Sequence, residues 1–353
     1  MSQWHTRRQM LALTGTIGVG LILGGCGVVA ARAGLYVAGP DGAPRWIDDT
    51  TGAPAWSPAG GALAWGDERG LRMWSDTTGQ LVTLIATPMV GRPAWSPDGS
   101  AIAFLDMQTR VLQALNIASR STTPLAVLYE GSDGAIRPPI VTRGGPAWSP
   151  DGSRIAFICW DGQGDELCVV DAAGDVRQQV TTLGGVQDGT SGKARSSVTS
   201  MAWSPDGEAL AVAVQAEQRG ATSGIFHVDL AERTGRRLTS MAANSPLCWE
   251  TASDDVIYSA SVEGRSDVFR LPAAGGRPLP ATTELPDGAR DPAFDAAGAL
   301  AVVTGSQVAV LLPGSHEAVL RDVPGLASAV PALSPDGTSL AFLALGRPIA
   351  GYP

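Results

Sequence analysis

Apolar and polar residues alternate in short runs along this chain, and compact turn signals separate the runs. Residues 145–183 are typical: GPAWS is followed by the turn SPDG, the apolar run RIAFICW, a polar DGQGD turn, then ELCVVD and VRQQVTTL. Runs of four to eight residues that alternate in polarity and are bounded by Gly, Pro and Asp indicate β-strands. This segment therefore predicts four short strands joined by tight turns.

The same phrase returns seven times, which makes the whole chain a repeat. Each copy has an aromatic or apolar anchor, and the anchors are spaced 39 to 55 residues apart, at Trp56, Trp95, Trp148, Trp203, Trp249, Phe294 and Leu333. A period near 45 residues built of strands and turns is typical of a β-propeller with one blade per repeat. The prediction is an all-β fold, a seven-bladed β-propeller of four-stranded blades.

The turn after the anchor has a specific chemistry. In Ser-Pro-Asp-Gly, proline presets φ, aspartate tolerates the next turn position, and glycine supplies a positive φ. The aspartates of these turns, Asp98, Asp151, Asp206 and Asp336, are therefore interpreted as turn residues and not as a ring of catalytic carboxylates. The preceding tryptophan is expected to pack between neighbouring blades.

The two ends of the chain each supply half a blade. Residues 329–345 offer two strands and residues 34–48 offer two more, GLYVAG and APRWID, around a Pro-Asp-Gly turn. Joining them completes the seventh blade and leaves no open sheet edge at the seam. The alternative is a ring of six blades.

The WSPDG phrase followed by an apolar strand resembles the WD-like repeat of TolB-type propellers, over about residues 34–353. The resemblance implies a propeller, and propellers host binding modules, lyases and hydrolase-gating domains. TolB itself is similar to a six-bladed propeller preceded by an α/β domain, whereas the repeats here number seven.

The N-terminal segment resembles an export signal. Arg7 and Arg8 precede the apolar stretch 10–25, which ends in Leu-Gly-Gly before Cys26. This resembles a bacterial lipoprotein signal with Cys26 as the lipidated residue, and Thr-Arg-Arg-Gln-Met-Leu also resembles a twin-arginine signal. The alternative is an uncleaved anchor, because residues 10–31 are long enough to span a bilayer.

Three segments follow from this interpretation: a signal peptide at 1–26, a short tether at 27–33 and a propeller at 34–353. Either form of the N-terminus predicts a propeller outside the cytoplasm, exported by the Tat or the Sec route and attached to the cell membrane. We expect a monomer.

The charge balance excludes one class of partner. The net charge is −9, and removing residues 1–26 takes away two arginines and no acidic residue, which leaves −11. An acidic chain without a basic stripe is not expected to bind nucleic acid.

Cys159 and Cys168 flank the predicted hairpin tip of the third blade. A turn at Gln163-Gly164 would set them directly opposite each other, at a distance that a disulfide can span. Two buried thiols are an equally good interpretation. Cys248 has no evident partner and is expected in the core.

Few residues suggest catalysis or a cofactor. There is no G-x-S-x-G motif, and His227 and His316 are the only histidines beyond the signal. Asp161, Asp165 and Glu166 form a weak calcium candidate, although a solvated hairpin tip without any metal explains them better. No catalytic residue and no cofactor is assigned.

Two insertions break the regular spacing, residues 129–145 and 183–198. Both connect the last strand of one blade to the first strand of the next, so they share the face opposite the Ser-Pro-Asp-Gly turns. They carry Arg137, Arg143, Lys193 and Arg195, a basic excess on an acidic protein. Long loops on a rigid scaffold favour binding, although surface loops of no consequence have the same composition.

The sequence therefore predicts a non-catalytic, extracytoplasmic scaffold that binds an envelope protein, a peptide or a cell-wall glycan and reaches the membrane through its lipid anchor. The alternative is a propeller hydrolase or a lactonase-like enzyme with its site at the mouth of the central channel. Such a site needs several polar side chains on the inner strands, which here offer mainly Ala, Trp, Ser and Pro.

Overall fold

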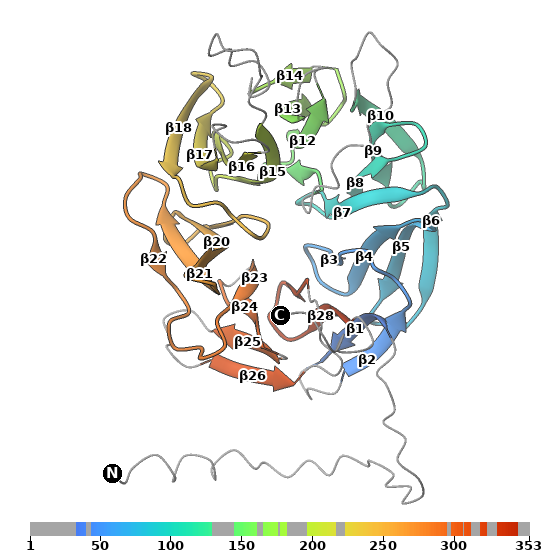
Figure 1. The fold of residues 1–353 in the computed structure, drawn as a ribbon. Coiled ribbons are helices and arrows are strands. Elements are labelled where there is room, and N and C mark those ends of the chain that lie inside the picture. Colours follow the sequence, from blue (N-terminus) through green and yellow to red (C-terminus); the bar gives the residue numbers. More distant parts are fainter. Residues whose placement is uncertain are drawn as a thin grey trace, which may run out of the picture. The chain divides into compact units, whose positions relative to one another are not determined.

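Seven antiparallel four-stranded sheets surround a central axis in the computed structural model (Figure 1). The structure describes residues 33–39, 44–128, 145–160, 165–175, 177–181, 196–216, 223–294, 298–305, 307–311, 318–322 and 330–344. The seven-bladed prediction is confirmed, and the six-bladed alternative is wrong.

Each sheet is one blade, with strands A to D running outward from the axis. Blade 1 holds β3 (Ala55–Trp56), β4 (Ala62–Asp67), β5 (Gly70–Ser75) and β6 (Leu81–Ile85). Blade 2 holds β7 (Met89–Trp95), β8 (Ala101–Asp106), β9 (Val111–Asn116) and β10 (Thr122–Val127). Blade 3 holds β11 (Ala147–Trp148), β12 (Arg154–Trp160), β13 (Asp165–Asp171) and β14 (Arg177–Gln179).

The remaining complete blades follow the same order. Blade 4 holds β15 (Ser196–Trp203), β16 (Ala209–Ala216), β17 (Gly224–Asp229) and β18 (Thr234–Thr239). Blade 5 holds β19 (Cys248–Glu250), β20 (Asp255–Val262), β21 (Arg265–Pro272) and β22 (Leu279–Pro280). Blade 6 holds β23 (Arg290–Phe294), β24 (Leu300–Thr304), β25 (Gln307–Leu311) and β26 (Ala318–Asp322).

Blade 7 joins the two ends of the propeller. Its strands are β27 (Ala332–Leu333), β28 (Leu340–Ala344), β1 (Gly34–Ala38) and β2 (Pro44–Asp48), in the sheet order β2-β1-β28-β27. The pairing of β1 with β28 is antiparallel and runs from Gly34 opposite Ala344 to Ala38 opposite Leu340. The predicted closure by the N-terminal strands is therefore confirmed, and both edges of the seam are paired.

The strand order gives the ring two distinct faces. Because neighbouring strands are antiparallel, the A-to-B turns, which carry Ser-Pro-Asp-Gly, lie on one face, here called the turn face. The B-to-C turns, such as residues 67–70, and the D-to-A connections, such as residues 86–88, lie on the opposite face, here called the loop face. The strand β1 is a C strand, so it begins on the loop face.

The core lies between neighbouring blades. On β12, Ile155 and Phe157 pack against blade 2, whereas Ala156 and Ile158 pack against blade 4. Both faces of this strand are buried, which explains why its sequence is a continuous apolar run.

The Ser-Pro-Asp-Gly turns form the same hydrogen bonds in each blade that has one. In blade 3, Ser149 Oγ donates to Asp151 at 2.6 Å, and the Ser153 N–H donates to the same carboxylate at 3.0 Å. Gly152 has φ 73° and its N–H donates to the Ser149 carbonyl at 2.9 Å. Hydrogen bonds from Ser149 and Ser153 lower the pKa of Asp151 to about 2. This aspartate thus stabilises its own turn by accepting hydrogen bonds, as the sequence predicted.

The anchor tryptophans also connect successive blades by hydrogen bonds. The indole N–H groups of Trp56, Trp95, Trp148 and Trp203 each donate to a carbonyl of the preceding blade's A strand, at 2.9–3.1 Å. The acceptors are the carbonyls of Ala332, Ala55, Ala94 and Ala147. In blade 5 the indole N–H of Trp249 donates instead to the Asp254 carboxylate of its own blade, at 2.8 Å. The tryptophan therefore fixes blade position by a directional bond as well as by packing.

Cys159 and Cys168 form a disulfide, with their Cα atoms 5.9 Å apart. The predicted register was wrong, because Cys159 lies opposite Glu166 and Cys168 lies opposite Phe157. The bond is therefore diagonal between β12 and β13, and it belongs to the core between blades 2 and 3. The hairpin turns one residue earlier than the sequence suggested, since Trp160 pairs with Asp165.

The described part of the chain consists of strands and turns and has no apolar helix of bilayer-spanning length.

Candidate functional site: the central channel

Two cavities lie inside the ring of A strands. One of about 770 Å³ opens at the loop face and is here called the mouth cavity. The other, of about 560 Å³, is lined by the A strands and is here called the channel cavity. Both lie within the range typical of sites for small ligands.

One position of the repeat lines these cavities in all seven blades. It is the residue three places before the anchor, and its members are Ala53, Arg92, Gly145, Ser200, Pro246, Asp291 and Val330. Only two members are charged, Arg92 in blade 2 and Asp291 in blade 6. The repeat therefore points five small or uncharged residues and two opposite charges at the axis.

Arg92 lines both cavities. Its Nε donates to the Pro54 carbonyl of blade 1 at 2.7 Å. Among the described residues, no carboxylate forms an ion pair with it. Burial lowers the pKa of this guanidinium, and no carboxylate offsets the effect.

Asp291, in contrast, is paired. It accepts a hydrogen bond from Arg290 Nη1 at 2.7 Å, and both side chains line the mouth cavity. Asp291 has φ 52°, a left-handed conformation that is uncommon for a residue other than glycine. The two charges of this pair cancel at the cavity wall.

Blade 5 contributes neutral polar groups to the mouth. Asn244 Nδ2 donates to Ser261 Oγ at 2.8 Å, and Ser245 Oγ accepts the N–H of Ser259 at 3.0 Å. Ser259 itself is 1% exposed and lines the mouth cavity, but its Oγ has no hydrogen-bond partner within the described chain.

Cys248 lies in the wall of both cavities, in the repeat position that other blades fill mainly with alanine. It is the free cysteine of the described residues, and burial raises its pKa to about 11. The thiol is thus protonated at neutral pH and is a poor nucleophile.

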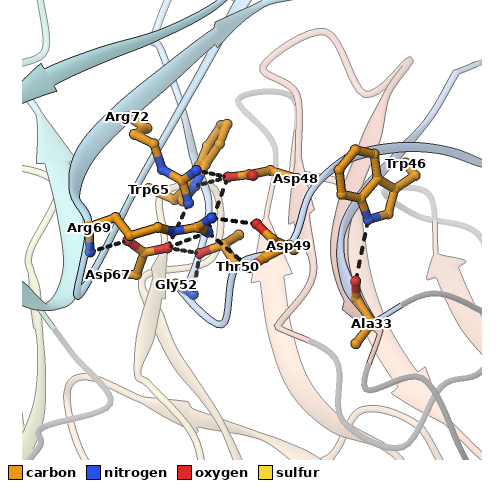
Figure 2. Close-up of polar contacts among 10 residues, drawn as sticks. All are labelled: Ala33, Trp46, Asp48, Asp49, Thr50, Gly52, Trp65, Asp67, Arg69 and Arg72. Atoms are coloured by element: carbon orange, nitrogen blue, oxygen red, sulfur yellow. Dashed lines mark hydrogen bonds and ion pairs between the residues drawn. The ribbon is translucent and has the colours of Figure 1, made fainter.

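A charged cluster lies at the seam of the ring (Figure 2), and one of its members, Asp67, lines the mouth cavity. Arg72 is 7% exposed and bridges two carboxylates, at 2.5 Å to the buried Asp48 of blade 7 and at 2.6 Å to the half-buried Asp67 of blade 1. Trp65 Nε1 donates to Asp48 at 3.2 Å, and Thr50 Oγ1 donates to Asp67 at 2.7 Å. This seam cluster ties the closing strand β2 to blade 1.

Arg69 completes the seam cluster from the exposed side (Figure 2). It pairs with Asp49 and, at 3.0 Å, with Asp67. Burial alone would raise the pKa of Asp67, but hydrogen bonds from Thr50 and Arg69 outweigh it and hold that pKa below its ordinary value.

Most of the candidate site residues predicted from the sequence do not belong to these cavities as the structure describes them. Cys26, Arg137, Arg143, Lys193, Arg195, Asp161 and His316 lie outside the described residues. Asp165 and Glu166 do not form a solvated hairpin tip, because both are buried and Thr181 Oγ1 donates to Glu166 at 2.5 Å. Across the described ranges, no three His, Cys, Asp or Glu side chains are placed to hold a metal ion.

Sequence reasoning missed Arg92, Asp291 and the seam cluster. Aligning the seven repeats one residue further upstream would have revealed the first two, because that position faces the axis in each blade. The inner-strand residues that are mainly Ala, Trp, Ser and Pro begin two places before the anchor, one residue after the axis-facing position.

The fold and repeat define a β-propeller with TolB-type repeats. The model of the TolB β-propeller domain family matches residues 142–346, more than half of the chain. The chain belongs to this family. No curated protein sequence matches it.

Three solved structures are similar to this chain at low sequence identity, and the second and third of them, with TM-scores above 0.5, share its fold. TolB from Acinetobacter baumannii is 18% identical, with a TM-score of 0.49 over 84% of this chain and 64% of that one. A protein described as TolB from Agrobacterium tumefaciens is 16% identical, with a TM-score of 0.52 over 77% of this chain and 95% of that one. Hydrazine synthase from Kuenenia stuttgartiensis is 15% identical, with a TM-score of 0.60 over 85% of this chain and 94% of that one. The TolB-type propeller supports a role as a binding scaffold, and the last of these structures is an enzyme with the same fold.

Proposed function

We propose that this protein is a membrane-tethered propeller outside the cytoplasm, which binds an envelope protein, a peptide or a cell-wall glycan on its loop face without catalysing a reaction. The observation that carries the proposal is the mouth cavity of about 770 Å³ on that face, held by a rigid ring of seven blades. A concave surface on a rigid scaffold favours binding.

We expect the two long insertions to add to the same face, because the described strands beside them place their ends there. The first follows β10, which ends at Val127 on the outside of the ring, and precedes β11, which begins at Ala147 beside the axis. Gly145, the last residue of the first insertion, and Ser200, two residues after the second, line the channel cavity. A partner seated on the mouth would therefore be flanked by the segments that carry Arg137, Arg143, Lys193 and Arg195.

The tether would hold this face near the membrane. Lipidation at Cys26 would leave about eight residues before β1, which begins on the loop face at Gly34, a reach of roughly 27 Å at most. The four basic residues could then contact anionic headgroups or an acidic membrane-bound partner.

The titratable groups of the cavities support binding over catalysis. Asp67 and Asp291 are engaged by arginines, and Cys248 is protonated at neutral pH. His227 packs against Trp249, with ring centroids 5.9 Å apart, and lines neither cavity. No pair of nucleophile and base is therefore formed by the cavity-lining residues that the structure describes. Metal analysis of the purified protein would test the competing enzyme interpretation.

Reversing the charge of Arg137, Arg143, Lys193 and Arg195 to glutamate is expected to weaken binding of the chain from residue 27 onward to anionic vesicles. Each basic residue near such a surface contributes about 1 kcal/mol. The measurement is co-sedimentation with vesicles and, in parallel, capture of components from an envelope extract. The control reverses four exposed arginines of the turn face and outer edge, Arg120, Arg233, Arg237 and Arg277. Binding unchanged in both assays contradicts the role of these residues.

Replacing Cys26 with alanine is expected to leave an unprocessed precursor of higher mass in the membrane fraction, because lipidation precedes cleavage of the signal. Mass spectrometry of the wild-type and variant proteins is the measurement. If the wild-type protein also retains residues 1–25, the lipoprotein interpretation fails and the uncleaved anchor is the correct one.

A further inference from the structure

Arg92 differs from the other arginines near the mouth in having no counter-ion. Arg69, Arg72 and Arg290 each form an ion pair with a carboxylate, whereas Arg92 donates only Nε to a backbone carbonyl of the described chain. A guanidinium has five N–H donors in a planar fork. Four of them, on the two Nη atoms, remain for a ligand at the junction of the mouth and channel cavities.

A half-buried guanidinium without a carboxylate partner is unfavourable. Removing a charge from water without a partner costs free energy, and the lowered pKa of Arg92 reflects that cost. A carboxylate that approached the Nη atoms would form two parallel, charge-assisted hydrogen bonds. The ligand would thus supply the partner that the protein does not.

Ser259 is a second, independent indication of a ligand. Its Oγ is buried in the wall of the mouth cavity without a hydrogen-bond partner in the described chain. Buried hydroxyls are nearly always paired. Apolar lining by Met89, Leu247 and Val330 lies in the same cavity. The site therefore combines a cationic group, one free hydroxyl and an apolar wall.

The charges around the mouth select against multiply charged anions. The positive charges of Arg72 and Arg290 are already matched by Asp48, Asp67 and Asp291. Glu68 adds a negative charge at the cavity wall, and the whole chain carries −9. Arg92 is left to balance a single negative charge.

We propose that the central cavities bind a small organic monocarboxylate, with its carboxylate on the guanidinium of Arg92, its apolar body against Met89 and Leu247, and a polar group near Ser259. This site shares the mouth cavity with the proposed function and adds a small ligand at its junction with the channel cavity. Vesicle binding and envelope capture report on the basic residues of the two insertions and not on Arg92, so the two proposals can fail separately.

Calorimetric titration of the full chain with a set of monocarboxylates tests the proposal. The probes are hexanoate, benzoate and N-acetylleucine, with hexanamide and benzamide as neutral counterparts and phosphate and citrate as multiply charged anions. We expect saturable binding of at least one monocarboxylate and no binding of its amide. Arg92→Gln should weaken that binding at least tenfold, Arg92→Lys should retain part of it, and Ser259→Ala should weaken it a few-fold.

The matched control is Arg154→Gln. Arg154 also donates to a backbone carbonyl, that of Gly207, at 2.6 Å, and lies outside both cavities. Its replacement should leave the affinity unchanged. Without ligand, Arg92→Gln should melt at the same temperature as the wild type or higher, because the variant no longer holds a half-buried charge without a carboxylate partner.

Several results would overturn the proposal. They are binding of the amide as tight as that of the acid, unchanged affinity in Arg92→Gln, preference for phosphate or citrate, and no saturable binding of any of the three monocarboxylates. A lower melting temperature of Arg92→Gln together with unchanged binding would instead assign Arg92 a purely structural role.

Discussion

A chain that lacks residues 34–48 is expected to lose cooperative unfolding and to aggregate. The deletion removes β1 and β2, exposes the edge of β28 and takes away the buried side chains of Leu35, Val37 and Ile47. Each such side chain contributes about 1.5–3 kcal/mol, against a total stability of about 5–15 kcal/mol for a folded domain. Thermal unfolding followed by circular dichroism and size-exclusion chromatography are the measurements.

Two substitutions on the same strands test whether the deletion acts by disrupting the closure of the ring or merely by shortening the chain. Leu35 is fully buried on β1, so Leu35→Asp should reproduce the aggregation of the deletion. Arg45 is exposed on β2, and Arg45→Ser should behave nearly as the wild type. A soluble deletion variant with an unchanged melting temperature would show that the closure contributes little.

Replacing Arg72 with methionine is expected to destabilise the propeller by about 3–5 kcal/mol, the cost of removing one partner from a buried ionic network. The change leaves the buried Asp48 and the half-buried Asp67 with Arg69 as their remaining arginine (Figure 2). Equilibrium denaturation in urea at neutral pH measures the change in the free energy of unfolding.

The control for Arg72 is Arg237→Met, an exposed arginine of β18 whose loss should change stability by about 0.5 kcal/mol or less. The destabilisation by Arg72→Met should also depend on pH. Asp67 has a pKa in the folded protein that lies below its unfolded value near 3.9. Its contribution to the free energy of unfolding is therefore complete above about pH 4 and is lost as the pH falls through the folded pKa. The difference between the two proteins should shrink over that acidic range, and a constant difference would contradict the role of Asp67.

The hairpin of blade 3 and the axis-facing residues show where sequence reasoning failed. The sequence indicates a turn near residues 161–164, but a shift of one residue in its centre changes which cysteine faces which neighbour. The sequence also shows that Arg92 directly precedes the Pro-Ala-Trp phrase of blade 2, but not that its side chain reaches the junction of two cavities.

The sequence by itself determined the number of blades, the composite seventh blade and the chemistry of the turns. These features depend on contacts between residues close in the chain, such as Ser149 with Asp151, or on a pattern that recurs in each repeat. Only the tertiary structure decided that Arg72 joins Asp48 to Asp67 across the seam and that Arg92 is left without a counter-ion. Strand twist and blade packing set those distances, and no local pattern records which charges will meet once the ring has closed.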